Sequence, residues 1–389
     1  MKKILRIINR FNLGGPTYNA AYLTKYLESD YETLLIGGQH DESEKSSIHI
    51  VDDLGLKPVI IPEMQRSINP YKDQIAYRKI QNIIREFKPD IVHTHAAKAG
   101  TLGRRAAYKL GVKQIYHTFH GHVFHSYFGS FKTKIFKEIE RNLAKKSTKI
   151  IAISDIQKRE LSKIHRICPE EKIEVIPLGF DLQRFSTNKD SKRKEFRKKW
   201  NIKENEIAIG IIGRLVPIKN HLFFIDVIQE VIKKSELPIK AFIVGDGDEK
   251  QNIINYIKSK NLDYSFDYSP ATFHLTSWIK EIDRVNSGMD IICLTSLNEG
   301  TPVSLIEAQA SGKPIVSTKT GGIENIVIEN KTALLSKNND LHNFSENLLS
   351  LVNSSNKRKL FSKYGLEKSK DFHYEKLINR MKNLYEIKL

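Results

Sequence analysis

Cysteine is scarce in this sequence, since Cys168 and Cys293 are the only two among 389 residues. Two cysteines so far apart supply neither a disulfide framework nor the paired spacing of a zinc site. We expect both to be buried thiols, which fits a reducing cytoplasm.

Long apolar runs are also absent, because no stretch approaches the roughly 18 residues that cross a bilayer. The first residues carry the positive charge of a signal peptide, but Arg6, Asn9 and Arg10 interrupt any apolar core. We therefore interpret this stretch as a first β-strand. These features favour a cytoplasmic protein.

Acidic residues are in deficit, with 45 Asp and Glu against 63 Lys and Arg, which leaves a net charge of +18. Such a balance indicates an anionic partner: a nucleic acid, an anionic membrane face or a phosphorylated substrate. A biased genome rich in Lys, Asn and Ile codons is the plainer explanation. The 40% hydrophobic content is that of a globular protein, and the length suits two domains.

Apolar runs alternate with helical patterns along the whole chain, which predicts α/β domains with parallel, doubly wound sheets. A break at Pro177 and a basic run at 192–199 indicate two domains, residues 1–178 and 191–373, joined by a linker at 179–190. Predicted strands are 3–9, 33–36, 58–61, 91–93, 114–118, 149–153, 173–176, 207–212, 239–244 and 289–294, and predicted helices are 17–28, 71–87, 97–110, 130–146, 155–164, 221–234 and 303–310.

The second half contains an acidic motif at a strand-to-helix junction. Glu299 follows the apolar run 289–294, with Gly300 beside it. The stretch 303–310 has helical character, with Thr301 available as N-cap and Pro302 at the first helical position. Free N–H groups at a helix N-terminus bind phosphate.

Glu307 lies about five residues into that helix, roughly 7.5 Å along its axis. Two carboxylates on either side of a phosphate site suit a ligand with hydroxyls at both ends of a phosphate, as in a nucleotide sugar. An acidic loop followed by a solvated surface helix is the alternative.

Two further loops suit phosphate. Gly14 and Gly15 connect the first strand to a helix, as in a phosphate cradle, although paired glycines are also common in plain turns. Arg214 and Lys219 lie five residues apart on a strand-to-helix loop. Arg can chelate two phosphate oxygens and Lys acts as a point charge, whereas a simply solvated basic loop is the alternative.

Polar residues gather where strands of the first half end. His95, Lys98, His120 and Ser154 all follow predicted strands, and the carboxyl ends of parallel strands form one ligand-binding edge. The histidines lack the Asp or Glu spacing of a metal site. They suit hydrogen bonding to a sugar or, alternatively, a structural role.

An aromatic and basic segment covers residues 119–146. A basic helix beside exposed aromatic residues can rest on an anionic membrane surface, whereas an ordinary amphipathic helix that covers the sheet is the alternative. The aromatic residues are Phe119, Phe124, Tyr127 and Phe128, the cations include Lys134, Lys137 and Arg141, and the predicted apolar stripe is Phe131, Ile135, Ile139 and Leu143.

The order of these motifs resembles the retaining family-4 glycosyltransferases of the GT-B fold. The resemblance is carried by the stretches 213–220, 244–247, 299–308 and 312–318 and by the Gly321-Gly322 pair, and it extends over essentially the whole chain. It implies two Rossmann-like, doubly wound domains that face each other across a cleft. The donor nucleotide is then held mainly by the second domain, and the last helix, 374–389, packs back on the first.

The resemblance also implies roles for individual residues. Arg214 and Lys219 would hold the donor diphosphate, Glu307 the ribose and Glu299 the transferred sugar, with His120 beside that sugar. No metal and no cofactor are expected, because the two cations stabilise the leaving diphosphate. The expected catalytic residues are Glu299 and His120; the donor site comprises Gly14, Gly15, Arg214, Lys219, Gly300, Thr301, Pro302 and Glu307, and the acceptor or sugar site His95, Lys98 and Ser154.

One departure concerns the nucleotide base. Many family members carry a glycine before the base-contacting loop, where this chain has the stretch 273–277, so uridine and guanosine both stay open, with uridine the commoner donor. The stretches 94–100 and 117–122 resemble bacterial enzymes that build capsule, exopolysaccharide or O-antigen on polyprenyl diphosphate. We therefore expect a hexose or N-acetylhexosamine donor, a lipid-linked glycan acceptor and attachment at the inner face of the membrane.

Three alternatives remain at this stage. A nucleotide-sugar 2-epimerase of the same fold would act without an acceptor. A nucleic-acid-binding protein fits the charge, but the sequence carries no helix-turn-helix, zinc or RNA-binding signature. An inactive scaffold is disfavoured by the presence of both acids and both cations.

Overall fold

The computed structural model describes the chain except residues 12–14, 28, 40–47, 66, 121–129 and 388–389 and the side chains of 130–132. It divides into two compact units. The first contains Met1–Phe180 and Phe372–Leu389, and the second contains Asp181–Asp371. Within the described residues, no helix combines the length and the apolarity that a bilayer crossing requires.

The first unit is built on a seven-stranded parallel sheet with the order β3-β2-β1-β4-β5-β6-β7. The carboxyl ends of β4 and β5 therefore lie side by side, which brings His95 next to His120. The strands are β1 (Lys2–Arg10), β2 (Tyr31–Gly38), β3 (Val59–Ile60), β4 (Ile91–His95), β5 (Gln114–Phe119), β6 (Lys149–Ala152) and β7 (Ile173–Val175).

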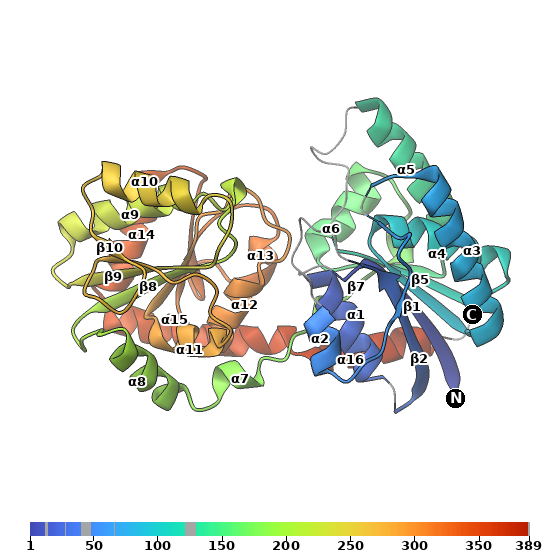
Figure 1. The fold of residues 1–389 in the computed structure, drawn as a ribbon, viewed down its shortest axis with the longest axis horizontal. Helices are drawn as coiled ribbons and strands as arrows, with labels where there is room; N and C mark the ends of the chain where they lie inside the picture. The colour runs from blue at the N-terminus through green and yellow to red at the C-terminus, as the bar shows by residue number, and fades with distance from the viewer. Residues whose placement is uncertain (12–14, 28, 40–47, 66, 121–129, 388–389) are drawn as a thin grey trace. The chain divides into compact units, whose positions relative to one another are not determined.

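Helices cover both faces of this sheet (Figure 1). On one face, α3 and α4 bury alternate strand residues such as Leu5 and Val92, and on the other, α1 and α16 cover Ile4 and Ile91. This is the doubly wound arrangement that the alternating sequence predicts. The helices are α1 (Gly15–Lys25), α2 (Ile48–Asp53), α3 (Pro70–Phe87), α4 (Ala97–Lys109), α5 (Ser130–Lys145), α6 (Asp155–Arg159), which continues as a π-helical turn to Ile164, and α16 (Tyr374–Tyr385).

The second unit repeats the plan, with a parallel sheet ordered β10-β11-β9-β8-β12-β13-β14. Its strands are β8 (Ile207–Ile212), β9 (Ile239–Val244), β10 (Tyr264–Ser265), β11 (Phe273–Leu275), β12 (Ile291–Leu294), β13 (Ile315–Thr318) and β14 (Ala333–Ser336). Its helices are α7 (Gln183–Ser186), α8 (Lys189–Lys199), α9 (His221–Lys234), α10 (Lys250–Ser259), α11 (Ile282–Gly288), α12 (Val303–Ala310), α13 (Ile323–Ile326), α14 (Leu341–Val352) and α15 (Ser355–Ser369).

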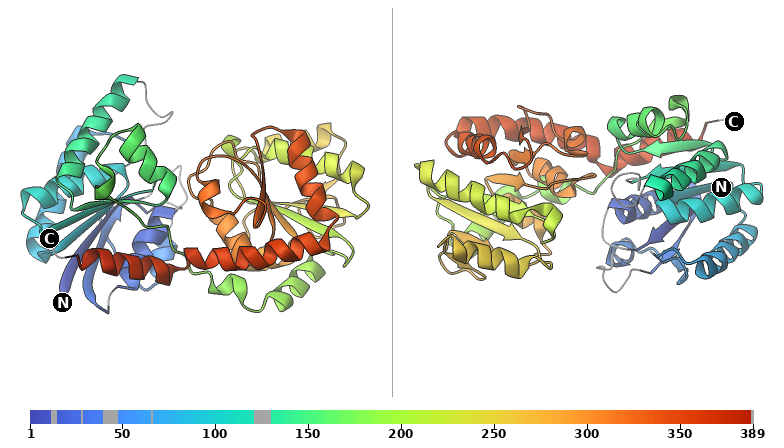
Figure 2. Two further views of the ribbon diagram at one scale, coloured as in Figure 1. Left: turned by 180° about the vertical axis from the view of Figure 1, so that it is seen from behind. Right: turned by 90° about the horizontal axis from the view of Figure 1, so that it is seen from above.

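The C-terminal helix α16 packs on the first unit rather than on the unit that precedes it. Leu377 and Met381 join the core formed with Ile4 and Tyr116, and Figure 2 shows α16, in dark red, beside the blue strands of that sheet. Most of the segment predicted as a linker, 179–190, does not form a separate connection between the two units. Residues 181–190 fold into α7 and the start of α8 and belong to the second unit.

The predicted apolar stripe of α5 is wrong at two positions. Ile135 and Ile139 are 46% and 36% exposed, whereas Leu143 is buried as expected. The face of α5 that is buried differs from the predicted one because Glu140 points inward, where its Oε2 pairs with Nη2 of Arg104 at 2.6 Å. The α5 helix therefore presents two isoleucines to solvent. The aromatic residues Phe124, Tyr127 and Phe128, and the side chain of Phe131, lie outside the described residues.

Candidate functional site

The loop that carries Arg214 and Lys219 follows β8 and is held by backbone contacts on two sides. On one side, Gly245 has φ +146°, and a Cβ there would lie 1.9 Å from the carbonyl oxygen of Gly213. On the other side, the hydroxyl of Thr295 donates to the carbonyl of Lys219 at 2.9 Å. A loop fixed in this way holds its cations with little loss of conformational entropy on ligand binding.

Glu299 lies beside Lys219, on the loop after β12. The Lys219 ammonium donates to Oε1 of Glu299, and the Ser296 hydroxyl donates to the same oxygen at 2.6 Å. Both charged side chains are largely buried, 19% exposed for Lys219 and 10% for Glu299. The structure thus brings together two residues that are 80 positions apart and that the sequence assigns to neighbouring parts of one ligand.

Two glycines form the surface against which the Glu299 loop packs. The N–H of Gly322 donates to the carbonyl of Glu299 at 3.0 Å. A Cβ at Gly322 would lie 1.8 Å from the carbonyl oxygen of Gly300, and one at Gly321 would lie 1.9 Å from that of Glu299. The backbone of the loop approaches this pair so closely that only glycine fits.

Helix α12 has the predicted limits, but Pro302 is not its first residue. Val303 is its first residue, and Pro302, in an extended conformation, occupies the cap position without a side-chain hydrogen bond. Thr301 was predicted as the N-cap, and this is wrong because it lies two residues before the helix. The first turn of α12 thus has no side-chain cap, and its N–H groups keep their capacity to bind an anion.

Glu307 projects from α12 and is partly buried. Burial raises the pKa of its carboxyl to about 7; the positive charge of Arg184 opposes this rise and Asp283 adds to it. Within the described part of the chain, no hydrogen bond or ion pair reaches the Glu307 carboxyl, and the same is true of the exposed Arg214 guanidinium. A carboxyl group and a cation without partners suit a ligand whose hydroxyls meet the carboxyl and whose phosphate meets the cation.

In the first unit, His95 and His120 form a pair at the carboxyl ends of β4 and β5. His95 Nδ1 and His120 Nε2 are 3.0 Å apart, so one ring donates and the other accepts. Burial lowers the pKa of His120 to about 3, and burial with the neighbouring cations holds the pKa of His95 well below its usual range. The pair is therefore neutral near pH 7.

The outer nitrogens of this pair, His95 Nε2 and His120 Nδ1, are buried and have no partner among the described residues. Because the inner nitrogens share one proton, the outer two always present one donor and one acceptor. That combination matches a hydroxyl group, which both donates and accepts.

The other predicted residues of the first unit have local partners or lie outside the description. Gly14 is not among the described residues, and Gly15 is the first residue of α1. Lys98 pairs with Asp73 at 2.7 Å and also donates to the carbonyl of Ser67. Lys98 thus ties α4 to the start of α3.

Ser154 is the N-cap of α6, where its hydroxyl accepts from the N–H of Gln157 at 3.1 Å. The sequence pattern placed Ser154 correctly at a strand end, and the structure gives its hydroxyl a structural partner there.

Sequence reasoning missed Ser296 and Ser277. Ser277 has φ +53°, a conformation that favours glycine, and its hydroxyl donates to Asp246 at 2.6 Å. The signal was present in the stretch 273–277, where the resemblance leads one to expect a glycine. Ser277 is held by Asp246 and by the N–H of Gly245, which donates to the carbonyl of Ser277 at 3.0 Å.

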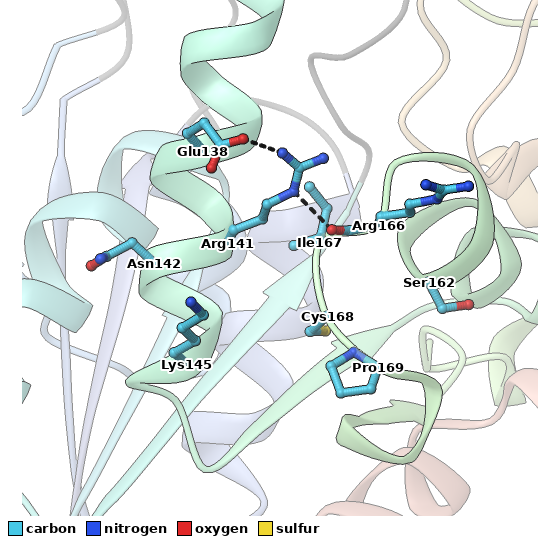
Figure 3. Close-up of a pocket in the computed structure, with 9 residues that line it drawn as sticks. All are labelled: Glu138, Arg141, Asn142, Lys145, Ser162, Arg166, Ile167, Cys168 and Pro169. Carbon is cyan, nitrogen blue, oxygen red and sulfur yellow. Dashed lines mark hydrogen bonds and ion pairs between the residues drawn. The ribbon is translucent and has the colours of Figure 1, made fainter.

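A groove of about 560 Å³ lies elsewhere in the first unit, between α5 and the chain before β7 (Figure 3). Arg141 spans it and donates to the carbonyl of Arg166 at 2.8 Å. The groove adjoins the amino ends of β6 and β7, the edge opposite to the histidine pair. Of the residues that the structure describes, no cluster of three His, Cys, Asp or Glu side chains could hold a metal ion.

Comparison with known families covers nearly the whole chain. Residues 13–184 match the model described as Glycosyltransferase Family 4, and residues 192–368 match Glycosyl transferases group 1. The chain is 28% identical, over 84% of its length and 86% of the relative, to UDP-Gal:alpha-D-GlcNAc-diphosphoundecaprenol alpha-1,3-galactosyltransferase of Escherichia coli. An uncharacterized glycosyltransferase of Methanocaldococcus jannaschii is 26% identical over 99% of this chain and 98% of its own.

Solved structures share the fold at low identity. HepE of Anabaena in complex with UDP superimposes with a TM-score of 0.80 at 17% identity, covering 100% of both chains. A glycosyltransferase of Rickettsia africae gives a TM-score of 0.79 at 19% identity, covering 99% of this chain and 98% of its own. These likenesses establish the two-unit architecture.

Proposed function

This chain belongs to the glycosyltransferases of the GT-B fold, and we propose that it moves a hexose or N-acetylhexosamine from a UDP sugar to a polyprenyl-diphosphate-linked glycan. The observation that carries this proposal is the likeness to the Escherichia coli galactosyltransferase, whose name specifies both a UDP sugar and a diphosphoundecaprenol acceptor. The polysaccharide would be one of the bacterial cell surface.

In this proposal, Arg214 and Lys219 bind the donor diphosphate. Arg214 is exposed and unpaired within the described residues, so it can engage phosphate oxygens without first breaking an ion pair. Lys219 is already held beside Glu299. Together with the uncapped first turn of α12, the two cations would stabilise the charge that develops as the diphosphate leaves.

Glu299 would orient the transferred sugar. One of its oxygens, Oε1, accepts from both Lys219 and Ser296, which fixes the carboxylate and leaves the other oxygen for a sugar hydroxyl. For a retaining course, the acceptor oxygen attacks the anomeric carbon on the face from which the phosphate departs. The bond from carbon to phosphate oxygen breaks, and a phosphate oxygen takes the acceptor proton.

Glu307 would accept hydrogen bonds from the ribose hydroxyls. Its carboxyl has no partner among the described residues, and its pKa of about 7 shows how strongly burial disfavours the free carboxylate. Hydrogen bonds from two hydroxyls would favour the ionised form and offset that cost. The neutral His95–His120 pair would bind a sugar hydroxyl without adding charge.

The lipid-linked acceptor would be reached from the inner face of the membrane, with α5 as the contact. Ile135 and Ile139 are exposed on this helix beside the exposed Lys134. An apolar pair beside an exposed cation can enter the headgroup region of an anionic bilayer.

The test is an assay of UDP sugars with a GlcNAc-diphosphate lipid carrying a short polyprenyl chain. We expect a product that contains the sugar from one UDP donor, formed with release of UDP. A Glu299→Gln variant should still bind UDP but lose turnover. Conversion of a UDP sugar into a different UDP sugar without acceptor would instead identify an epimerase and overturn the proposal.

A further inference from the structure

The interior of the first unit contains a cation with no anionic partner. Arg6, on β1, is 0% exposed, and none of the described Asp or Glu side chains pairs with it. Its guanidinium donates to Thr24 Oγ1 at 3.2 Å, to the carbonyl of Leu23 at 3.1 Å and to Tyr385 OH at 3.3 Å. A buried charge satisfied only by neutral groups is costly to keep, which favours a function for it.

Tyr385, the last residue of α16, connects this cation to His93. Its hydroxyl lies 2.6 Å from His93 Nδ1, and Arg6 Nη1 is 3.4 Å from the same nitrogen. A guanidinium can only donate, so the approach of Arg6 to His93 Nδ1 disfavours a proton on that nitrogen, and Tyr385 accepts from Arg6 and donates its own proton to His93 Nδ1. His93 must then carry its proton on Nε2, which lies 2.7 Å from Thr118 Oγ1.

The ring of His93 is thereby fixed at both nitrogens, and it lies at the base of a column of histidines. The ring centroids of His93 and His95 are 4.2 Å apart, and those of His95 and His120 are 5.3 Å apart. Each ring is packed against the next, so the orientation of His93 limits how His95 can turn. His95 in turn is hydrogen-bonded to His120.

We propose that Tyr385 is a positioning residue for the candidate sugar-site histidines. Its hydroxyl selects the tautomer of His93, and the stacked rings transmit that orientation to His95 and His120. The C-terminal helix thus contributes to the site without contacting the substrate. This inference rests on the role proposed above for His95 and His120.

The test compares two tyrosines with different hydrogen-bond partners. Tyr116 and Tyr385 are both fully buried, and the hydroxyl of each joins α16 to the sheet, but Tyr116 donates to the backbone carbonyl of Leu384 at 3.0 Å. Tyr116→Phe is therefore a matched control that loses a similar bond without touching His93 Nδ1. Thr118→Val removes the partner of His93 Nε2 and serves as a second variant that leaves α16 intact.

We expect Tyr385→Phe and Thr118→Val to lower kcat between about 10- and 100-fold, because small misplacements of a site residue have effects of that size. The KM for the nucleotide sugar should stay unchanged, and Tyr116→Phe should keep its kcat. Nitrogen-15 spectra of the full-length protein should show His93 protonated on Nε2 in the wild type, and altered His95 and His120 signals in Tyr385→Phe but not in Tyr116→Phe.

The proposal is overturned if Tyr385→Phe and Tyr116→Phe lose kcat equally and the loss in each variant follows the fall in its melting temperature. Tyr385 would then be a structural residue only. Unchanged His95 and His120 signals in Tyr385→Phe would overturn it as well. The spectra need no substrate, so they test the histidine column even if the proposed donor and acceptor are wrong.

Discussion

Replacing Glu307 with glutamine should stabilise the protein above neutral pH. The pKa of Glu307 is raised by burial from its ordinary 4.5 to about 7. Between these values the folded state keeps a proton that the unfolded chain has released. Folding is therefore penalised increasingly as pH rises from 4.5, and the penalty is complete above pH 7.

The size of the effect follows from the two pKa values. A difference of about 2.5 pKa units corresponds to about 3 kcal/mol, since one unit is worth 1.36 kcal/mol. Glu307→Gln is uncharged at every pH and avoids this cost. For a domain of this size, about 3 kcal/mol corresponds to a rise in Tm of roughly 6–12 °C.

The assay is thermal unfolding of the full chain at pH 5 and pH 8, with Glu204→Gln as the control, because Glu204 is exposed. We expect Glu307→Gln to exceed the wild type only slightly at pH 5, to exceed it by the full amount at pH 8 and to lose the stabilisation that added UDP gives. Glu204→Gln should follow the wild type throughout. Equal Tm values for Glu307→Gln and wild type at pH 8 would refute the reasoning, as would a difference that does not change with pH.

Four further predictions concern the site and the membrane. Lys219→Met should weaken UDP binding and also lower turnover, because Glu299 loses its partner; calorimetry and steady-state kinetics measure the two effects, and unchanged UDP affinity would contradict the assignment. Gly322→Ala should lower kcat with little change in UDP affinity, because the added Cβ displaces the loop that carries Glu299; wild-type kcat would show that the loop tolerates the shift. Activity should persist in EDTA, and a loss restored by added magnesium would overturn the proposed charge stabilisation by two cations. Replacing both Ile135 and Ile139 with Ser should reduce sedimentation with anionic vesicles but not activity on a soluble acceptor, and undiminished sedimentation would exclude α5 as the membrane contact.

The sequence was sufficient to predict most of the fold. Strand runs such as 207–212 and the periodic helix 221–234 are recovered with the same limits, because buried parallel strands and amphipathic helices leave strong local patterns. The limits of α12 were also predicted, but its cap was not. The difference between Thr301 and Pro302 as the residue that precedes the helix depends on one backbone angle, which periodicity does not report.

The ordered motifs were also sufficient to predict candidate site residues of the second unit. Arg214, Lys219, Glu299 and Glu307 were all named from the spacing of these motifs. The tertiary structure decided which of these side chains are buried and which are paired. It pairs Lys219 with Glu299, leaves Glu307 partly buried without a partner among the described residues and engages Lys98 with Asp73. Burial and pairing depend on contacts between distant segments, and no local pattern contains them.

The clearest case is Tyr385. Read along the chain, it is an aromatic residue near the end of an amphipathic helix, and nothing in its neighbourhood distinguishes it. Only the packing of α16 on the first sheet brings its hydroxyl to His93, 292 positions earlier, and to the buried Arg6. The sequence by itself determined the two sheets and the residues at their carboxyl ends, because those follow from local periodicity. The partners of each polar group were decided by the tertiary structure, because burial forces such groups to find hydrogen bonds wherever the fold supplies them.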